Sequence, residues 1–289
     1  MALHFPEEIV TKHRIKFSAM EGLCILLRRL CYPNRLSDLV KVFNRDISSI
    51  SRIYLFMLNN IYSRYGHLLR TLKQFWLSPK DLENFCQVCY ESGSVLPNIC
   101  GFIDGTARPI CRPTLNQKEQ YSGYKKEHCL KYQSVVFPNG LIGRLDGPFN
   151  GRRHDAAILH LSGLIKELKE VFVNPDGTWY RLYGDPGYTN SKFINVGYTN
   201  KIHLTRYHKI FNKCMSELRV SVEYGFGKIL QLFAFNDFKK NNKLLLQPLK
   251  KQYIVSALLA NCHTCLRGSQ VSMYFKVDPP CIYEYLNRR

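Results

Sequence analysis

The chain has 289 residues, of which 45% are hydrophobic and 22% charged, a composition that can bury a core and that excludes wholesale disorder. Lysine and arginine number 41 against 22 acidic residues, so the formal net charge is +19, and the surplus is spread over the whole length rather than held in one tail. Such a surface suits a polyanion such as DNA or RNA, because neutralised phosphates release counterions; an ordinary soluble protein with a high pI is the alternative.

Residues 1–97 are predicted to form an all-helical region. Apolar residues recur at helical spacing in Met20–Leu27, and the segment RLSDLVKVFN predicts a second helix capped by Ser37. A third helix follows, because apolar residues three and four apart share one helical face. That face consists of Ile47, Ile50, Tyr54, Met57 and Ile61.

The two helices predicted between Leu36 and Tyr65 fit a helix-turn-helix, in which the second helix offers its first residues to the major groove of DNA. Ser48, Ser49, Ser51 and Arg52 would lie there, off the apolar face. An ordinary helical hairpin has the same pattern, so both interpretations stay open.

From residue 98 the apolar period changes from 3.6 to 2, and residues 98–289 are predicted to form a second domain. Apolar runs predict strands over Cys100–Asp104, Leu130–Val136, Leu141–Leu145 and Trp179–Tyr183. Helical patterns cover His154–Leu168, Asn212–Phe235 and Pro248–Leu266. Strands first and helices interleaved afterwards predict an α/β fold, a mixed sheet flanked by helices.

Three acidic residues stand out in this domain. Asp104 in FIDG and Asp185 in GDPG each follow a predicted strand, at the kind of sheet edge where ligands collect. Glu223 lies mid-helix on a face shared with Phe226 and expected to turn toward the core, where a buried carboxylate needs a partner. Each acid alone could be a cap or half of an ion pair, and Arg219, one turn before Glu223, is the obvious ion-pair alternative.

Together the three carboxylates predict a two-metal site in which Asp104 bridges both cations and Asp185 and Glu223 hold one each. Two cations about 3.5–4 Å apart can activate a water or hydroxyl and stabilise the leaving oxygen of a phosphodiester. Hard oxygen ligands select Mg²⁺ or Mn²⁺.

Four motifs follow one another in the chain: GFIDGTARPICRP, QKEQYSGYKKEHCLKYQSVVFPNGLIGRLDGPFNGRRHDAAIL, LYGDPGY and FNKCMSELRVSVEYGFGKI. In this combination and order they resemble the PIF/Harbinger-superfamily transposases and the Harbinger-transposase-derived nucleases (DDE transposase family 4), over roughly residues 20–280. The resemblance implies an RNase H-like core whose DDE triad falls on Asp104, Asp185 and Glu223, and hence a metal-dependent DNA endonuclease or transposase. It also implies a separately encoded Myb-like DNA-binding partner.

Two further segments match the family pattern, YKKEH and GRRHD. Their cationic side chains are the expected phosphate contacts: Lys125, Lys126, Arg152 and Arg153. His128, His154 and Asp155 are auxiliary candidates, and Asp155 is either a fourth acid or, as we favour, a carboxylate at a helix N-terminus. The chain departs from the pattern at Tyr124, where many relatives carry His, and it lacks a proline-rich loop after Asp185.

Eleven cysteines are scattered along the chain, and its start has no apolar signal segment, so reduced thiols and a cytosolic or nuclear location are expected. With DNA as the expected partner, the nucleus is favoured, and shuttling to the cytoplasm stays open. The pairs Cys86/Cys89 and Cys262/Cys265 have a zinc-like spacing but lie in helical patterns, which favours small apolar residues over ligands. No apolar run approaches the roughly 20 residues of a membrane span, so no membrane partner is expected.

Two other functions compete with catalysis. A domesticated, non-catalytic DNA-binding protein would use the helical region and the basic surface, although such a protein has no need to keep all three acids. A different metal phosphohydrolase, or a ribonuclease acting on RNA hybrids, would have no DNA-reading helical region. The sequence leaves the oligomeric state open, a homo-oligomer included.

Overall fold

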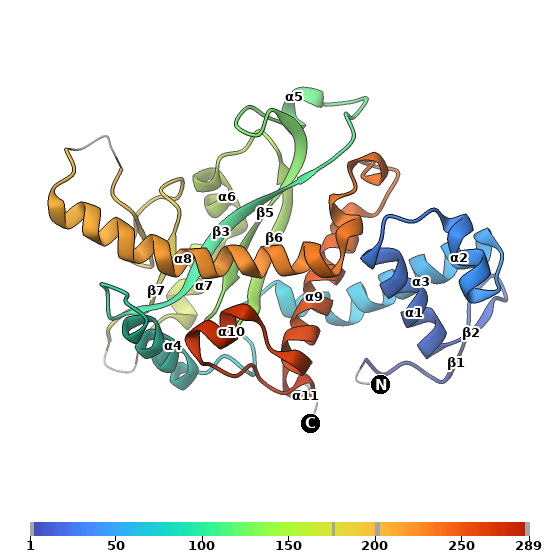
Figure 1. Cartoon of the computed structure of the whole chain (residues 1–289), viewed down its shortest axis with the longest axis horizontal. Coiled ribbons are helices and arrows are strands. Elements are labelled where there is room, and N and C mark those ends of the chain that lie inside the picture. The colour runs from blue at the N-terminus through green and yellow to red at the C-terminus, as the bar shows by residue number, and fades with distance from the viewer. Residues whose placement is uncertain (1–2, 175–176, 200–202, 287–289) are drawn as a thin grey trace.

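The computed structural model describes residues 3–174, 177–199 and 203–286, with the side chains at 221 and 222 left aside. Helices lie on both sides of a central sheet, and the N-terminal helices pack at one end of it (Figure 1). The predicted α/β class, with an RNase H-like mixed sheet flanked by helices and a helical region before it, is confirmed.

The N-terminal region begins with a short β-hairpin that the sequence did not predict. Its strands are β1 (Glu8–Val10) and β2 (Lys16–Ser18), and four helices follow: α1 (Ala19–Cys31), α2 (Leu36–Phe43), α3 (Ile47–Tyr65) and α4 (Pro79–Glu91), with a 3₁₀ turn at Gly66–Leu69. Ser37 was predicted to cap the second helix, which is wrong: Arg35 holds the cap position, and Ser37 lies inside the first turn.

Helix α3 follows the predicted pattern closely. The side chain of Asp46 caps it by accepting a hydrogen bond from the backbone N–H of Ser49 at 2.9 Å. Four of the five residues on the predicted apolar face are buried, and the fifth, Ile47 in the first turn, is 50% exposed. The buried face packs against α1 and against α9 (Leu249–Arg267).

The central sheet has six strands in the order β4-β5-β3-β7-β8, with β6 pairing on the free side of β5. The strands are β3 (Ile99–Pro109), β4 (Tyr121–Ser122), β5 (Glu127–Val136), β6 (Ile142–Asn150), β7 (Arg181–Gly184) and β8 (Ile194–Val196). Strands β3, β5 and β6 pair antiparallel, whereas β7 and β8 run parallel to β3. The sheet is therefore mixed, as predicted, although β8 had no strand signal in the sequence.

Asp104 was predicted to end its strand, and this is wrong. Strand β3 continues to Pro109, because its antiparallel pairing with β5 runs from Phe102 to Pro109. What ends beside Asp104 is the parallel pairing with β7, whose last registered pair is Ile103 with Gly184.

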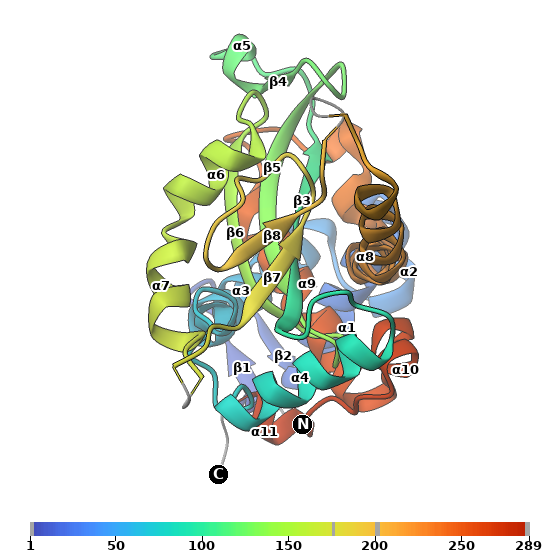
Figure 2. The ribbon, with the colours of Figure 1, turned by 90° about the vertical axis from the view of Figure 1, so that its left-hand side faces the viewer.

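Helices cover both faces of the sheet. Helices α6 and α7 lie along one face, and α8 lies on the opposite face (Figure 2). The remaining helices are α5 (Gln117–Gln120), α6 (Asp155–Ser162), α7 (Leu164–Val171), α8 (Arg206–Leu232), α10 (Gln270–Phe275) and α11 (Ile282–Tyr285). The single helix predicted over His154–Leu168 is divided, because Gly163 takes a left-handed backbone conformation with φ of 68°.

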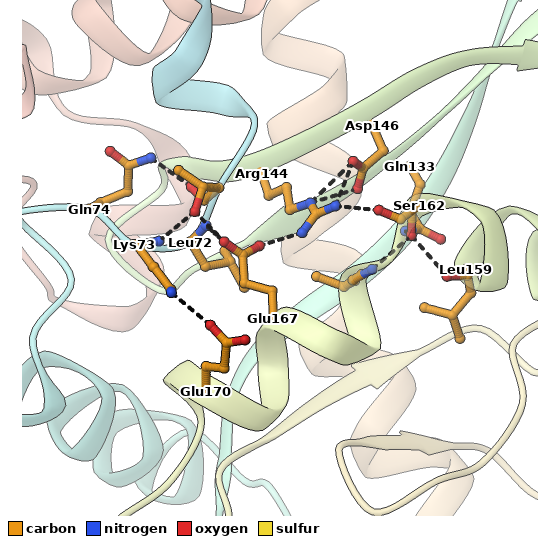
Figure 3. Close-up of polar contacts among 12 residues, drawn as sticks. Leu72, Lys73, Gln74, Gln133, Arg144, Asp146, Leu159, Ser162, Glu167 and Glu170 are labelled. Carbon is orange, nitrogen blue, oxygen red and sulfur yellow. Dashed lines mark hydrogen bonds and ion pairs between the residues drawn. The ribbon is translucent and has the colours of Figure 1, made fainter.

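The helical region and the sheet share one hydrophobic core. Helix α4 packs on β3, and α9 packs on α3, where the hydroxyl of Tyr54 donates to Gln252 at 3.3 Å. A buried polar network also joins them: Glu167 of α7 accepts from the backbone N–H of Leu72 at 2.9 Å and from Arg144 of β6 (Figure 3). The boundary between residues 97 and 98 stays a prediction. Among the described residues, no helix is both long and apolar enough to cross a membrane.

Candidate active site

Asp104 and Asp185 are neighbours at the place where β3 and β7 stop pairing. Ile103 and Gly184 are registered partners in parallel strands, which lie about 4.8 Å apart. Asp104 is the next residue of β3 and Asp185 is the residue directly after β7, so the register brings the two aspartates side by side. A backbone N–H group also orients each carboxylate: Asp104 accepts a hydrogen bond from Gly105 at 2.9 Å, and Asp185 accepts one from Gly187 at 2.8 Å.

Arg219 of α8 is the counter-ion of Asp104. Its Nη1 atom lies 3.5 Å from Oδ2 of Asp104, whose side chain is 15% exposed. Burial raises the pKa of Asp104 to about 6; Arg219 opposes that shift, and the nearby charges of Asp185 and Glu223 add to it. The three predicted acids are therefore close enough to act on one another electrostatically.

Glu223 was expected to turn toward the core, and this is wrong. Its side chain is 56% exposed, and its Oε1 atom accepts from Nη2 of Arg219 at 3.2 Å, one helical turn away. Phe226, which was predicted on the same face, is buried. Residues three apart on α8 do not point in the same direction, which separates the exposed Glu223 side chain from the buried Phe226 ring. The ion pair that the sequence offered as an alternative is present, and Arg219 joins Glu223 to Asp104.

Asp155 lies between Gly105 of β3 and Gly187 of the turn after β7. It is the first residue of α6, as predicted, and its two carboxylate oxygens lie 3.0 Å and 3.3 Å from where a Cβ atom would stand on Gly105 and Gly187. Lys131 of β5 pairs with it at 3.5 Å. A side chain larger than that of glycine at either position would therefore crowd the Asp155 carboxylate.

A basic hollow of about 780 Å³ adjoins this site. Among its lining residues are the predicted Arg152, Arg153, His128 and His154, together with Arg112, Lys118 and Lys131, which the sequence did not single out. Lys131 belongs both to the hollow and to the pair with Asp155, so the hollow leads to the acidic residues. A charged residue inside the predicted strand Leu130–Val136 was the signal that could have identified it, and its side chain is only 17% exposed.

The structure brings only part of the predicted DNA-contacting set together. Arg152 and Arg153 are exposed in the turn before α6, whereas Lys125 and Lys126 lie at the tip of the β4–β5 hairpin beside the hollow. Arg52 is exposed on α3, in the N-terminal helical region, and does not line the hollow.

The donor chemistry of the site fits a hard divalent cation. Asp104, Asp185 and Glu223 offer carboxylate oxygens only, and Arg219 is the positive charge now shared by two of them. The hydroxyl of Tyr188 is buried close to Gly105 and has no hydrogen-bond partner within the described part of the chain. In the described conformation of those same residues, no three His, Cys, Asp or Glu side chains are grouped so that they could hold a metal ion.

One protein-family model matches the part of the chain that carries this site. A family model described as DDE superfamily endonuclease matches residues 103–261, more than half of the chain. The match begins one residue before Asp104 and ends within α9, so it includes the three acids and the basic hollow. No curated protein and no solved structure matches the chain.

Proposed function

Because the chain belongs to the DDE superfamily endonucleases, we propose that it is a metal-dependent DNA endonuclease or transposase of the PIF/Harbinger type. The observation that carries the proposal is the register of β3 and β7, which sets Asp104 and Asp185 side by side at one sheet edge. Arg219 and the raised pKa of Asp104 support it, because both indicate carboxylates that need a nearby cation.

In this proposal Asp104, Asp185 and Glu223 hold Mg²⁺ or Mn²⁺. Such cations would activate a water or a DNA hydroxyl and stabilise the leaving oxygen of the phosphodiester. The chain's own contribution is orientation: the backbone N–H groups of Gly105 and Gly187 fix the two aspartates. The basic hollow would bind the DNA phosphates beside them, and Lys131 holds Asp155 at its edge.

Several finer points belong to the same proposal. The α2–α3 pair with Arg52 would contact DNA as a helix-turn-helix, and Lys125, Lys126, Arg152 and Arg153 would contact phosphates. His128, His154 and Asp155 would assist at the site. The partners would be DNA, a Myb-like accessory protein and a second copy of the chain, and the location would be the nucleus, with shuttling to the cytoplasm.

Nicking of a supercoiled plasmid in Mg²⁺ or Mn²⁺ tests the central point. Wild type should nick, EDTA should abolish nicking, and Asp104→Asn should reduce it at least about a hundredfold, more than the loss of an outer-shell partner of a metal ligand costs. Glu217→Gln is the matched control, because Glu217 is an exposed acid on the same helix as Glu223. Equal nicking by wild type and Asp104→Asn would sink the mechanism.

One observation favours a second candidate, a non-catalytic DNA-binding protein. Arg219 forms ion pairs with both Asp104 and Glu223 in the described conformation, and an inactive protein could retain these pairs. That candidate predicts DNA binding without any metal-dependent nicking, so the plasmid assay separates the two.

A further inference from the structure

The tip of the β4–β5 hairpin presents an aromatic ring to solvent. Tyr124 is 90% exposed, and Lys125 and Lys126 follow it directly. Lys126 has a left-handed backbone, with φ of 54°, which closes the turn into β5. A single exposed aromatic residue is common on protein surfaces, so its meaning depends on what surrounds it.

The hairpin under this ring is held firmly. Tyr121 pairs with His128, and their rings lie 5.3 Å apart between centroids in an edge contact. Ser122 is 3% exposed, and its hydroxyl accepts from the backbone N–H of Lys125 at 3.3 Å. These contacts hold the backbone that carries Tyr124.

The base of the hairpin is fastened to the turn on the other side of the hollow. Gln120 donates to Asn150 at 3.0 Å, and the backbone N–H of Arg152 donates to the carbonyl of Glu119 at 3.0 Å. A Cβ atom on Gly151 would come within 2.4 Å of the carbonyl of Gln120, so only glycine permits this close packing. The two walls of the hollow are thus joined by direct hydrogen bonds.

A lysine ammonium group and a tyrosine ring lie together at the tip of the hairpin. Nζ of Lys125 lies 5.5 Å from the centroid of the Tyr124 ring, and both Tyr121 and Tyr124 line the basic hollow. Proteins that hold a separated nucleic-acid strand combine cations for the phosphates with aromatic rings on which bases stack. A purely electrostatic phosphate site has no use for an exposed ring.

The pairing register of β5 gives the distance between the base of the hairpin and the acidic residues. Ser134 is opposite Asp104, and His128, which is opposite Tyr121, lies six residues away along β5. At about 3.3 Å per residue, the hairpin base is roughly 20 Å from the acids. That distance corresponds to about six base steps of B-form DNA.

We propose that Tyr124 is a wedge that inserts between bases of the DNA held in the hollow and opens the duplex at least about six steps from the cleavage site. This proposal rests on the proposed function for DNA as the substrate, and deepens it by naming distorted duplex DNA as the preferred form. The preference follows because a base that is already unpaired costs less to unstack.

Binding of labelled duplexes in metal-free buffer tests the wedge without any cleavage. Fluorescence anisotropy compares a perfect 30-base-pair duplex with the same duplex carrying a two-nucleotide bulge. Wild type should bind the bulged duplex at least about fivefold more tightly, the lower end of what base stacking contributes. Tyr124→Ala should lose that preference while keeping its affinity for the perfect duplex, and Tyr124→Phe should retain the preference.

The double variant Lys125→Ala, Lys126→Ala is the matched control, because it should weaken binding to both duplexes by the same factor and leave their ratio unchanged. The wedge is overturned if wild type shows no preference, if Tyr124→Ala keeps it, or if neither duplex binds. A preserved preference together with a lack of plasmid nicking would instead reject the nuclease and leave the wedge standing.

Discussion

Nη1 of Arg219 lies 3.5 Å from Oδ2 of Asp104, so a fixed positive charge of the protein stands at the acids that we expect to hold metal. The same guanidinium also pairs with Glu223. A divalent ion that binds to these carboxylates must compete with Arg219 for them, and it is repelled by the arginine's charge.

Arg219→Met should therefore bind Mn²⁺ more tightly than wild type. Even in a medium like bulk water, a unit charge about 5 Å from a divalent ion costs more than about 1.4 kcal/mol, so the gain should be about tenfold. Isothermal titration calorimetry with Mn²⁺ measures it. Lys213→Met is the control, because Lys213 is an exposed cation on the same helix and should change little. Equal or weaker binding by Arg219→Met would contradict the counter-ion role.

Glu167 joins the helical region to the sheet, and its replacement should destabilise the fold. Its carboxylate accepts from the hydroxyl of Thr71, from the backbone N–H of Leu72 and from Arg144, which also pairs with Asp146 (Figure 3). The side chains of Arg144 and Glu167 are 8% and 13% exposed. Glu167→Gln should lower the free energy of unfolding by about 2–3 kcal/mol, below the usual cost of breaking a buried pair because Arg144 keeps Asp146.

Urea unfolding measures this difference, and Glu170→Gln on the same helix is its control. Glu170 pairs with Lys73 at 2.7 Å, but these side chains are 49% and 62% exposed. An exposed pair contributes little to stability because solvent screens it, so this control should lie close to wild type. If Glu167→Gln and Glu170→Gln lose the same stability, the network around Glu167 does not hold the N-terminal helical region to the sheet.

The parts of the fold that the sequence predicted are those governed by local patterns. Helix α3 was predicted because its apolar spacing is a local pattern; its cap at Asp46, which was not predicted, is local as well. Asp104 and Asp185 were identified because each follows a mainly apolar run and stands one or two residues before a glycine. The sequence did not contain the signal for β8, since a three-residue strand is recognised only through its parallel pairing with β7.

The errors at the site arose where long-range geometry decides. The exposure of Glu223 depends on the direction in which α8 crosses the sheet, which helical periodicity does not fix. The end of β3 was misplaced because an antiparallel partner continues after the parallel one stops. Lys131 was missed because its place at the site depends on its ion pair with Asp155, which belongs to a different element.

The arginines of the basic hollow should control the salt dependence of DNA binding. Arg152 and Arg153 are both exposed on its wall. Each phosphate contact contributes about one unit to the slope of log affinity against log salt, so Arg152→Ala and Arg153→Ala should each reduce that slope by about one. Lys80→Ala, an exposed cation on α4, should leave it unchanged. Anisotropy titrations from low to moderate salt give the slopes. Unchanged slopes in both arginine variants would mean that these arginines of the hollow do not contact DNA phosphates.

Lys228 should make stability depend on pH above neutrality. Its ammonium donates to Thr264 and to the carbonyl of Gly268, both at 2.8 Å, and burial lowers its pKa from 10.5 to about 8. Between these two values the unfolded chain binds more protons than the folded one, so the free energy of unfolding should rise with pH in this window. The nearby His263 titrates below it, because burial and Lys228 lower its pKa from 6.5.

The comparison with Lys228→Met isolates this contribution, since every other titrating group is common to both proteins. Urea unfolding at pH 7, 8.5 and 9.5 should show wild type gaining stability relative to the variant as pH rises, because the cost of burying the charge disappears when the amine loses its proton. The same series with Lys213→Met should show no relative change, since that lysine is exposed. A constant difference between wild type and Lys228→Met over the three pH values would mean that the Lys228 ammonium titrates as it does in water.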